Sequence, residues 1–471
     1  MEHKTSASLT QPFSTDCRRA DERGSSGHHR TVGRFGDYAC DSPLELIESA
    51  AKHMRTRHAE NVEFVLWTGD ITVARSTTEL ERYQAIRNMT ELLSRTFSSH
   101  FVFPVLGHLD PAPSENLTNL WMHWLPLEAL QTFKIGGYYT IEQSHSKLRI
   151  VALNTNLFSG RDASSPAAGK QWAWLSAVLE KAQDNNEMVY IVGHAPPGPA
   201  ARPGHRAYSP EDNARYLRTV RRFARGIAGQ FFGHLHEDTF RVVYDNDQPV
   251  SWALLAPSVS PYAGPASATN PRLRLYKFDT NTGKVLDYTQ YSLDLTAANR
   301  AGTAEWVTEY NMTTHYALPD ISPASLHALA DRLRYAPHET MTFNKRIFAE
   351  WVAEYNMTKH YALPDISPAS LHALADRLRY APHETMTVNK YLRAYHSGSS
   401  EACDGACAHQ HYCAITCLEH LSYRQCVEAA ASALAAAGDS APLVAPLNNI
   451  VLTFIVLLAI CLEKYLHCVM H

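Results

Sequence analysis

The stretch Gln230-Phe231-Phe232-Gly233-His234-Leu235-His236 places two histidines directly after a short apolar run. Side chains two residues apart on a strand point to the same face, and on the loop after a strand both imidazoles can turn toward one point. Glycine lets the backbone turn sharply, so the next side chain projects from the carboxyl end of the strand. Open α/β sheets form their binding sites at this end. The stretch therefore predicts a strand that ends at a functional site.

Three other apolar runs, at 62–66, 101–106 and 188–192, end in the same manner. Each is followed by a glycine and then a residue that can bind a metal, and these residues are Asp70, His108 and His194. One Gly-His pair alone is most often a turn beside a surface histidine, but four such junctions favour a shared site. Imidazole and carboxylate together suit zinc, iron or manganese, and two neighbouring ions of this kind can bind a phosphate and activate water.

The order Gly-Asp, Gly-His, Gly-His and Gly-His-x-His resembles the motif order of the calcineurin-like metallophosphoesterases. The stretches Gly36-Asp37-Tyr38-Ala39-Cys40-Asp41-Ser42-Pro43 and Gly193-His194-Ala195-Pro196-Pro197-Gly198, with the C-terminal cysteines, narrow the resemblance to the acid sphingomyelinase-like phosphodiesterases. The resemblance extends from about Gly36 to Glu428. It implies an α/β fold, a layered sandwich of two mixed β-sheets flanked by helices, with a small helical, disulfide-containing C-terminal subdomain.

The sequence suggests four parts. Residues 1–35 are polar, lack periodicity and are expected to be disordered. Residues 36–300 are expected to form the metallophosphoesterase domain, 301–428 the C-terminal subdomain, and 429–471 a spacer with a hydrophobic anchor signal. Residues 306–345 recur at 351–390 with 37 of 40 positions identical, so one segment of the subdomain is duplicated in tandem. Two copies do not make a solenoid, which needs about three.

The resemblance also implies the roles of the site residues. In the family two metal ions share an Asp, which matches Asp70, and the second ion takes ligands that match His108, His194 and His234. The first ion takes a residue that matches His236 and an Asp-x-His near the amino terminus, a pattern that this chain lacks. The candidate metal ligands are therefore Asp70, His108, His194, His234 and His236, with zinc as the expected ion, two in the family and one here.

The chain departs from the family pattern at its second motif. His108 stands where the family has Asn, and Leu109 stands where the family has a His that assists the leaving group. We assign His108 as the candidate catalytic residue as well as a ligand. The expected function is metal-dependent hydrolysis of a phosphodiester of a lipid or nucleotide type. The alternative is a catalytically impaired cell-surface relative that binds or regulates. A net charge of −4 provides no basic surface for nucleic acid.

Five of the nine cysteines lie between Cys403 and Cys426. Such a cluster is either a disulfide-stapled module or a zinc site, and the lack of paired C-x-x-C motifs favours disulfides. The resemblance implies the pairs Cys403–Cys407 and Cys413–Cys426, and a partner for Cys40 upstream of this chain.

Four Asn-x-Thr sequons are expected to carry glycans in an extracellular, secreted or cell-surface protein, and they lie at Asn88, Asn116, Asn311 and Asn356. The first 35 residues contain no apolar signal-peptide core. The apolar run at 450–462 is too short to span a bilayer, but it follows a small-residue stretch and a spacer, as in a glycosylphosphatidylinositol signal. We therefore expect the membrane to be a partner through a C-terminal anchor.

Local signals predict where several helices begin. Ser42-Pro43-Leu44-Glu45 and Ser209-Pro210-Glu211 each place an N-cap serine before a proline at the first helical position, and Ser76-x-x-Glu79 has the spacing of a capping box. After His236, the runs at 241–244, 251–255, 273–278 and 285–291 are expected to be antiparallel strands that close one sheet.

Overall fold

A computed structural model of the 471-residue chain describes residues 33–38, 40–58, 62–71, 78–142, 147–159, 166–200, 207–261, 269–334, 395 and 405–438. The chain divides into two compact units, Met1–Val427 and Glu428–His471. The sheets, the packed helices and the candidate site all belong to the first unit.

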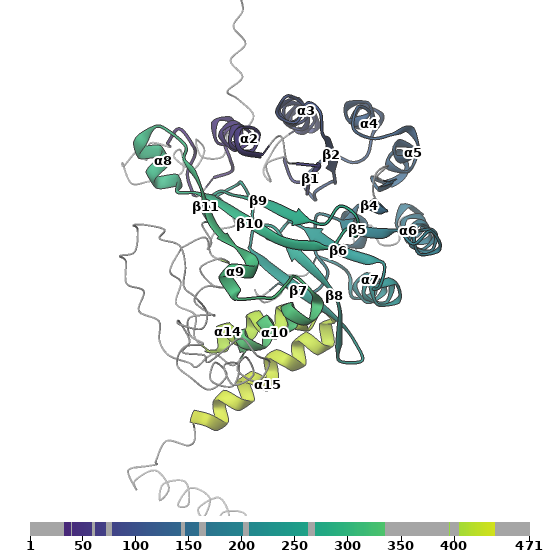
Figure 1. Cartoon of the computed structure of the whole chain (residues 1–471), viewed down its shortest axis with the longest axis vertical. Helices are drawn as coiled ribbons and strands as arrows, with labels where there is room; N and C mark the ends of the chain where they lie inside the picture. Colours follow the sequence, from purple (N-terminus) through teal and green to yellow (C-terminus); the bar gives the residue numbers. More distant parts are fainter. Residues whose placement is uncertain are drawn as a thin grey trace, which may run out of the picture. The chain divides into compact units, whose positions relative to one another are not determined.

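The largest sheet has six strands in the order β3-β4-β5-β6-β8-β7 (Figure 1). These strands are β3 (Tyr139–Glu142), β4 (Leu148–Ala152), β5 (Met188–Val192), β6 (Ile227–Phe232), β8 (Gln248–Leu255) and β7 (Thr239–Asp245). The four strands from β4 to β8 run parallel, whereas β3 and β7 are antiparallel edge strands. Buried parallel strands are apolar on both faces, which explains why β5 is an unbroken apolar run.

Two smaller sheets pack on one face of the large sheet. Strands β1 (Phe64–Trp67) and β2 (Phe101–Pro104) pair in parallel, and β9 (Arg272–Phe278), β10 (Val285–Leu293) and β11 (Trp306–Asn311) form an antiparallel sheet. The Tyr139 hydroxyl of β3 donates to the Pro104 carbonyl oxygen at 2.9 Å, and the rings of Phe231 and Tyr276 lie 4.9 Å apart. These contacts create the sandwich that the sequence predicted.

The prediction that the strands after His236 close one sheet is wrong in detail. Strand β8 joins the large sheet beside β6 and β7, whereas β9 and β10 belong to the second layer. The apolar runs alone do not separate these arrangements, because strands in either layer contribute apolar side chains to the same core.

Helices cover both outer faces (Figure 1). The described helices of the chain are α2 (Leu44–His58), α3 (Glu79–Thr96), α4 (Glu115–Trp121), α5 (Leu127–Gly136), η1 (Thr155–Phe158), α6 (Pro166–Asp184), α7 (Pro210–Phe223), α8 (Leu295–Ala301), α9 (Met312–Tyr316), α10 (Pro323–Arg334), α14 (Gly405–Thr416) and α15 (His420–Gly438). Ser209 caps α7 as predicted. The capping box of α3 is Thr78 with Glu81, so the predicted start at Ser76-x-x-Glu79 is two residues early.

The first copy of the tandem repeat forms β11, α9 and α10. Its predicted leucine stripe is buried, with Leu326, Leu329 and Leu333 at most 2% exposed, and α10 packs on α14, β7 and β8. The second copy at 351–390, Asn356 and the apolar run at 450–462 lie outside the described residues. Within the part of the chain that is described, no helix has the length and apolar character needed to cross a membrane.

The cysteine module contains the predicted disulfide Cys413–Cys426, which links α14 to α15. Cys407 is also in a disulfide, as is Cys40, and the partner of each lies outside the described residues, as does Cys403. Cys417 keeps its thiol. The pair Cys403–Cys407 therefore stays a prediction.

Replacing both Cys413 and Cys426 by Ala should lower the free energy of unfolding by about 2–4 kcal/mol, because the crosslink closes a loop in the unfolded chain. Denaturant titration of the purified protein measures the change. The matched control is Cys417→Ala on the same helix-helix connection, which should shift the transition much less. Equal transitions for the double variant and the control would contradict a stabilising role for the disulfide.

Candidate metal centre

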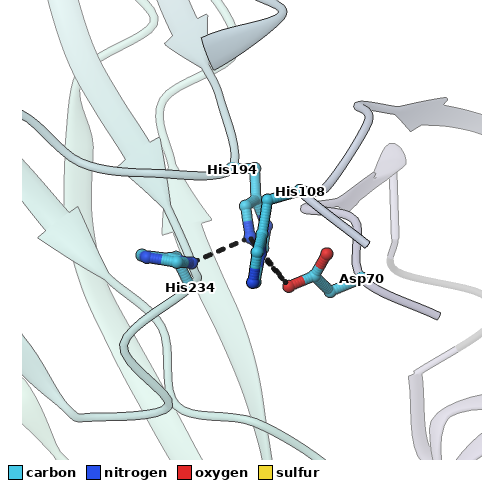
Figure 2. A group of neighbouring side chains, drawn as sticks. All are labelled: Asp70, His108, His194 and His234. Carbon is cyan, nitrogen blue, oxygen red and sulfur yellow. Dashed lines mark hydrogen bonds and ion pairs between the residues drawn. The ribbon is translucent and has the colours of Figure 1, made fainter. Parts of the chain in front are cut away.

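The carboxyl ends of four strands from both layers meet at one edge of the sandwich. Asp70 follows β1, His108 follows β2, His194 follows β5 and His234 follows β6, and Figure 2 shows their side chains converging. The turn after β2 requires glycine, because a Cβ on Gly107 would lie 2.1 Å from the Asp70 Oδ1 atom. The Gly-ligand junctions of the sequence thus bring loops together that are far apart along the chain.

The four side chains surround one point at close range. Asp70 Oδ2 lies 2.7 Å from His108 Nδ1 and 2.9 Å from His194 Nε2. His194 Nε2 also lies 3.2 Å from His108 Nδ1 and 3.1 Å from His234 Nδ1. One ligand atom from each residue falls within 4.8 Å of the others. These distances describe a single cluster of one carboxylate and three imidazoles.

The protonation of His194 is set by a backbone oxygen. Its Nδ1 lies 2.7 Å from the Thr68 carbonyl oxygen, which can only accept, so Nδ1 carries a proton and Nε2 is the ring nitrogen that faces Asp70 and can bind an ion once it is deprotonated. Tetrahedral zinc with bonds of about 2.0–2.1 Å separates its ligands by about 3.3 Å. The donor set and its separations therefore fit one divalent ion.

The pKa shifts show how the cluster responds to burial. Burial alone would raise the pKa of Asp70, but hydrogen bonds from His108 and His194 and the charges of these residues outweigh burial and hold it below its ordinary value. Burial, together with the neighbouring His194 and His108, lowers the pKa of His234 to about 3. A neutral His234 beside an ionised Asp70 is the protonation state that binds a cation.

Residues 28–238 match the family model described as calcineurin-like phosphoesterase, and residues 248–347 and 337–433 each match the acid sphingomyelin phosphodiesterase C-terminal region. The human acid sphingomyelinase-like phosphodiesterase 3b is 37% identical over 328 residues, covering 64% of this chain and 72% of the relative. The chain belongs to the acid sphingomyelinase-like phosphodiesterases.

Two further relatives are named for two different substrates. A cyclic GMP-AMP phosphodiesterase of Bos taurus is 37% identical over 66% of this chain and 74% of that protein. A sphingomyelin phosphodiesterase of Bos taurus is 32% identical over 69% of this chain and 55% of that protein. The family is one of metallophosphoesterases, so its members use divalent metal, which agrees with the cluster of possible ligands.

Three of the candidate ligands in this sphingomyelinase-like chain have strained backbone. Asp70, His234 and His236 have φ angles of 56°, 68° and 58°, in the left-handed region that non-glycine residues seldom occupy. Each such residue costs on the order of 1–3 kcal/mol, and the conformation persists only where surrounding contacts fix it. The strain lies in the loops that carry the predicted ligands.

Asp110 fixes the first of these loops, a role that the sequence analysis missed. Its carboxylate accepts the backbone N–H groups of Asp70 at 2.8 Å, Ile71 at 3.1 Å and Gly107 at 2.8 Å. The carboxylate thereby ties the loop after β1 to the loop after β2. A possible signal was present in Gly107-His108-Leu109-Asp110, where the Asp follows the glycine by three residues.

A buried ion pair fixes the loop after β6. Asp238 accepts from Arg274 Nη2 at 2.5 Å and from the Tyr310 hydroxyl, and the Asp238 and Arg274 side chains are 3% and 2% exposed. Arg274 belongs to β9 and Tyr310 to β11, so the His234 loop is anchored to the second layer. Four of the five predicted ligands form the close group described above. His236, the fifth, is not part of this group.

Asp110→Asn should destabilise the protein by about 1–3 kcal/mol, because an amide nitrogen would face backbone N–H donors in place of a carboxylate oxygen. Chemical denaturation measures this change. Asp279→Asn is the matched control, since Asp279 also accepts two backbone N–H groups, from Asn281 and Thr282, but in an exposed turn. Similar losses at the two positions would show that Asp110 has no special role at the junction of the loops.

Proposed function

We propose that this chain is a metal-dependent phosphodiesterase that acts on a phosphodiester of the lipid or nucleotide type. The observation that carries the proposal is the convergence of Asp70, His194 and His234, with His108, on a single point beside the strand ends. A zinc-class ion held there would bind a phosphoryl oxygen and lower the pKa of a water molecule. The relatives named for sphingomyelin and for cyclic GMP-AMP support both substrate classes.

Some residues of the cluster are suited to bind the ion, and another is suited to contact the substrate. His194 is 2% exposed and Asp70 10% exposed, so both are suited to fixed ligation. His108 has a side chain that is 49% exposed, so its ring is accessible to a bound substrate. As the candidate catalytic residue, His108 would orient the phosphate and move a proton at the leaving oxygen through its second ring nitrogen.

We infer that the activity of this chain is weak. The sequence lacks the Asp-x-His that the family uses for a second ion, and His236 is not in the four-residue group. Leu109 also places an aliphatic side chain where the family has a polar one. The second candidate function, a cell-surface relative that binds or regulates, rests on these same observations.

We further propose that the protein is extracellular, glycosylated and joined to a membrane by a C-terminal anchor. Asn116 and Asn311 are exposed, as glycan acceptors need to be, and Asn88 is half-buried on α3. The Cys413–Cys426 disulfide is typical of an oxidising compartment. Enzymatic deglycosylation of secreted protein and release from cells by a phosphatidylinositol-specific phospholipase C test the two modifications separately.

Purified protein should contain about one zinc-class ion per chain, because one set of ligands is complete. Elemental analysis after dialysis measures the ratio. His194→Ala should lose the ion, whereas His327→Ala, at a half-exposed histidine on α10, should retain it. Two equivalents in the unchanged chain would contradict the single-ion site.

Hydrolysis of bis-(p-nitrophenyl) phosphate should be much slower than for a family member that has the Asp-x-His. Leu109→His should raise the rate by less than about tenfold, although a well-placed acid group contributes about 10²–10⁴-fold, because residues that act as a unit do not contribute additively. Leu127→His, at a leucine 73% exposed on α5, is the control. Activity equal to that of the full relative would refute the impaired site.

A further inference from the structure

The loop that carries His194 is buried along almost its whole length. Among residues 193–200, Gly198 alone is partly exposed, and the others are buried. Loops normally lie on the surface, because their backbone N–H and C=O groups need water or another hydrogen-bond partner. The burial of this loop therefore requires another segment of the chain that covers it.

The connection between α14 and α15, residues 417–419, covers the far end of this loop. Leu418 is 5% exposed and packs in the same apolar cluster as Ala195 and Tyr208. Its contact with Gly198 is close, because a Cβ at position 198 would lie 2.8 Å from Leu418 Cδ2. Gly198 also has a φ angle of 83°, which glycine adopts without strain. Glycine thus serves both the turn of the loop and the approach of the connection.

Asn213 of α7 binds the loop and the connection at the same time. Its Oδ1 accepts the Gly198 N–H at 2.8 Å, and its Nδ2 donates to the Leu418 carbonyl oxygen at 2.7 Å. An N–H group can only donate and a carbonyl oxygen can only accept, so one orientation of the amide satisfies both partners. Beside it, Arg221 Nη2 pairs with Glu419 Oε1 at 2.8 Å. The connection is therefore held on α7, directly against the ligand loop.

The path from Gly198 back to His194 is short and stiff. It consists of residues 195–197, of which the second and third are prolines. Each proline ring fixes φ at about −65° and restricts the backbone of the residue before it. At the near end, the Ala195 N–H donates to Thr155 Oγ1 at 3.0 Å. A displacement at Gly198 is therefore passed on to His194, since few backbone torsions between them can absorb it.

We propose that the connection between α14 and α15 positions His194, with Leu418 and Asn213 as positioning residues, so that docking of the cysteine module sets the affinity of the candidate metal centre. The role rests on the proposed function, in which His194 is a ligand of the ion. The connection itself needs no contact with the ion, because it acts through Gly198 and the two prolines. The Cys413–Cys426 disulfide supports the arrangement by holding α14 to α15.

The first test measures the zinc dissociation constant of the full chain by competition with a chelating dye. Leu418→Asp should raise this constant by about tenfold to a hundredfold, as the loss of a group that orients a metal ligand does. Leu418→Met keeps an apolar side chain of similar size, and Leu421→Asp changes a leucine that is 65% exposed on α15. Both should bind zinc as the unchanged chain does. Unchanged affinity in folded Leu418→Asp would overturn the proposal.

Asn213→Asp is a second variant of nearly identical shape, for use also where Leu418→Asp does not fold. A carboxylate oxygen can still accept the Gly198 N–H, but at pH 8 the side chain has no hydrogen to donate to the Leu418 carbonyl oxygen. An added negative charge by itself favours a cation, so weaker zinc binding reports a displaced ligand. If Asn213→Asp binds zinc normally and only Asn213→Leu, which loses both bonds, binds it weakly, α7 alone positions the loop and the proposal is wrong.

Amide hydrogen exchange in the zinc-free chain separates this role from the proposed function. Leu418→Asp should speed exchange about tenfold or more at Ala195 as well as at Gly198, because the whole loop loses its support. Faster exchange at Gly198 alone would show that the prolines do not transmit the displacement, and would overturn the proposal. If the unchanged chain holds no zinc, the proposed ion is wrong, and exchange at Ala195 still decides whether the connection positions the loop. Denaturant titration confirms that each variant compared is folded.

Discussion

The hydrogen bond from His194 Nδ1 to the Thr68 carbonyl oxygen joins the two layers at the point where the candidate site forms. His194 comes from the end of β5 in the large sheet, and Thr68 from the loop after β1 in the other layer. The bond fixes the tautomer and the ring orientation, so Nε2 faces the Asp70 carboxylate. Ligand convergence is therefore a consequence of how the two layers pack.

The strained loops explain why buried polar groups lie around the site. Backbone in the left-handed region is costly, and a loop adopts it only if the alternative conformations cost more. At Asp70, the Asp110 carboxylate accepts three backbone N–H groups. Any other conformation of the loop would leave these N–H groups without their hydrogen-bond acceptor, so the strained conformation is preferred. Asp238 does the same for the His234 loop, because moving it would leave the Arg274 charge buried without its pair. The candidate ligands and the residues that fix their loops therefore form one mechanical unit.

Much of the fold could be predicted from the sequence, and so could the meeting of four of the five candidate ligands, because strand-glycine-ligand junctions are local patterns. The N-cap at Ser209 was equally local and is confirmed. Sheet membership after His236 could not be predicted, since both layers feed one core and their strands have the same apolar character. Asp110 was missed because its role depends on Ile71 and its neighbours, which are distant in sequence. The i, i+2 spacing of His234 and His236 brings both rings to one face only on an extended strand, and both residues instead lie in the left-handed region.

The tandem repeat provides two nearly identical segments, and only one of them can form β11, α9 and α10 at their place beside β10. Thr308 and Thr314, which differ from the second copy, are both exposed, so the buried contacts of β11 and α9 do not distinguish the copies there. The connection to β10 does, because 12 residues separate Leu293 from Trp306 and 57 separate it from Trp351. The entropic cost of closing a connection grows with its length, which favours the first copy. Chain connectivity, more than side-chain packing, selects the copy that completes the second layer.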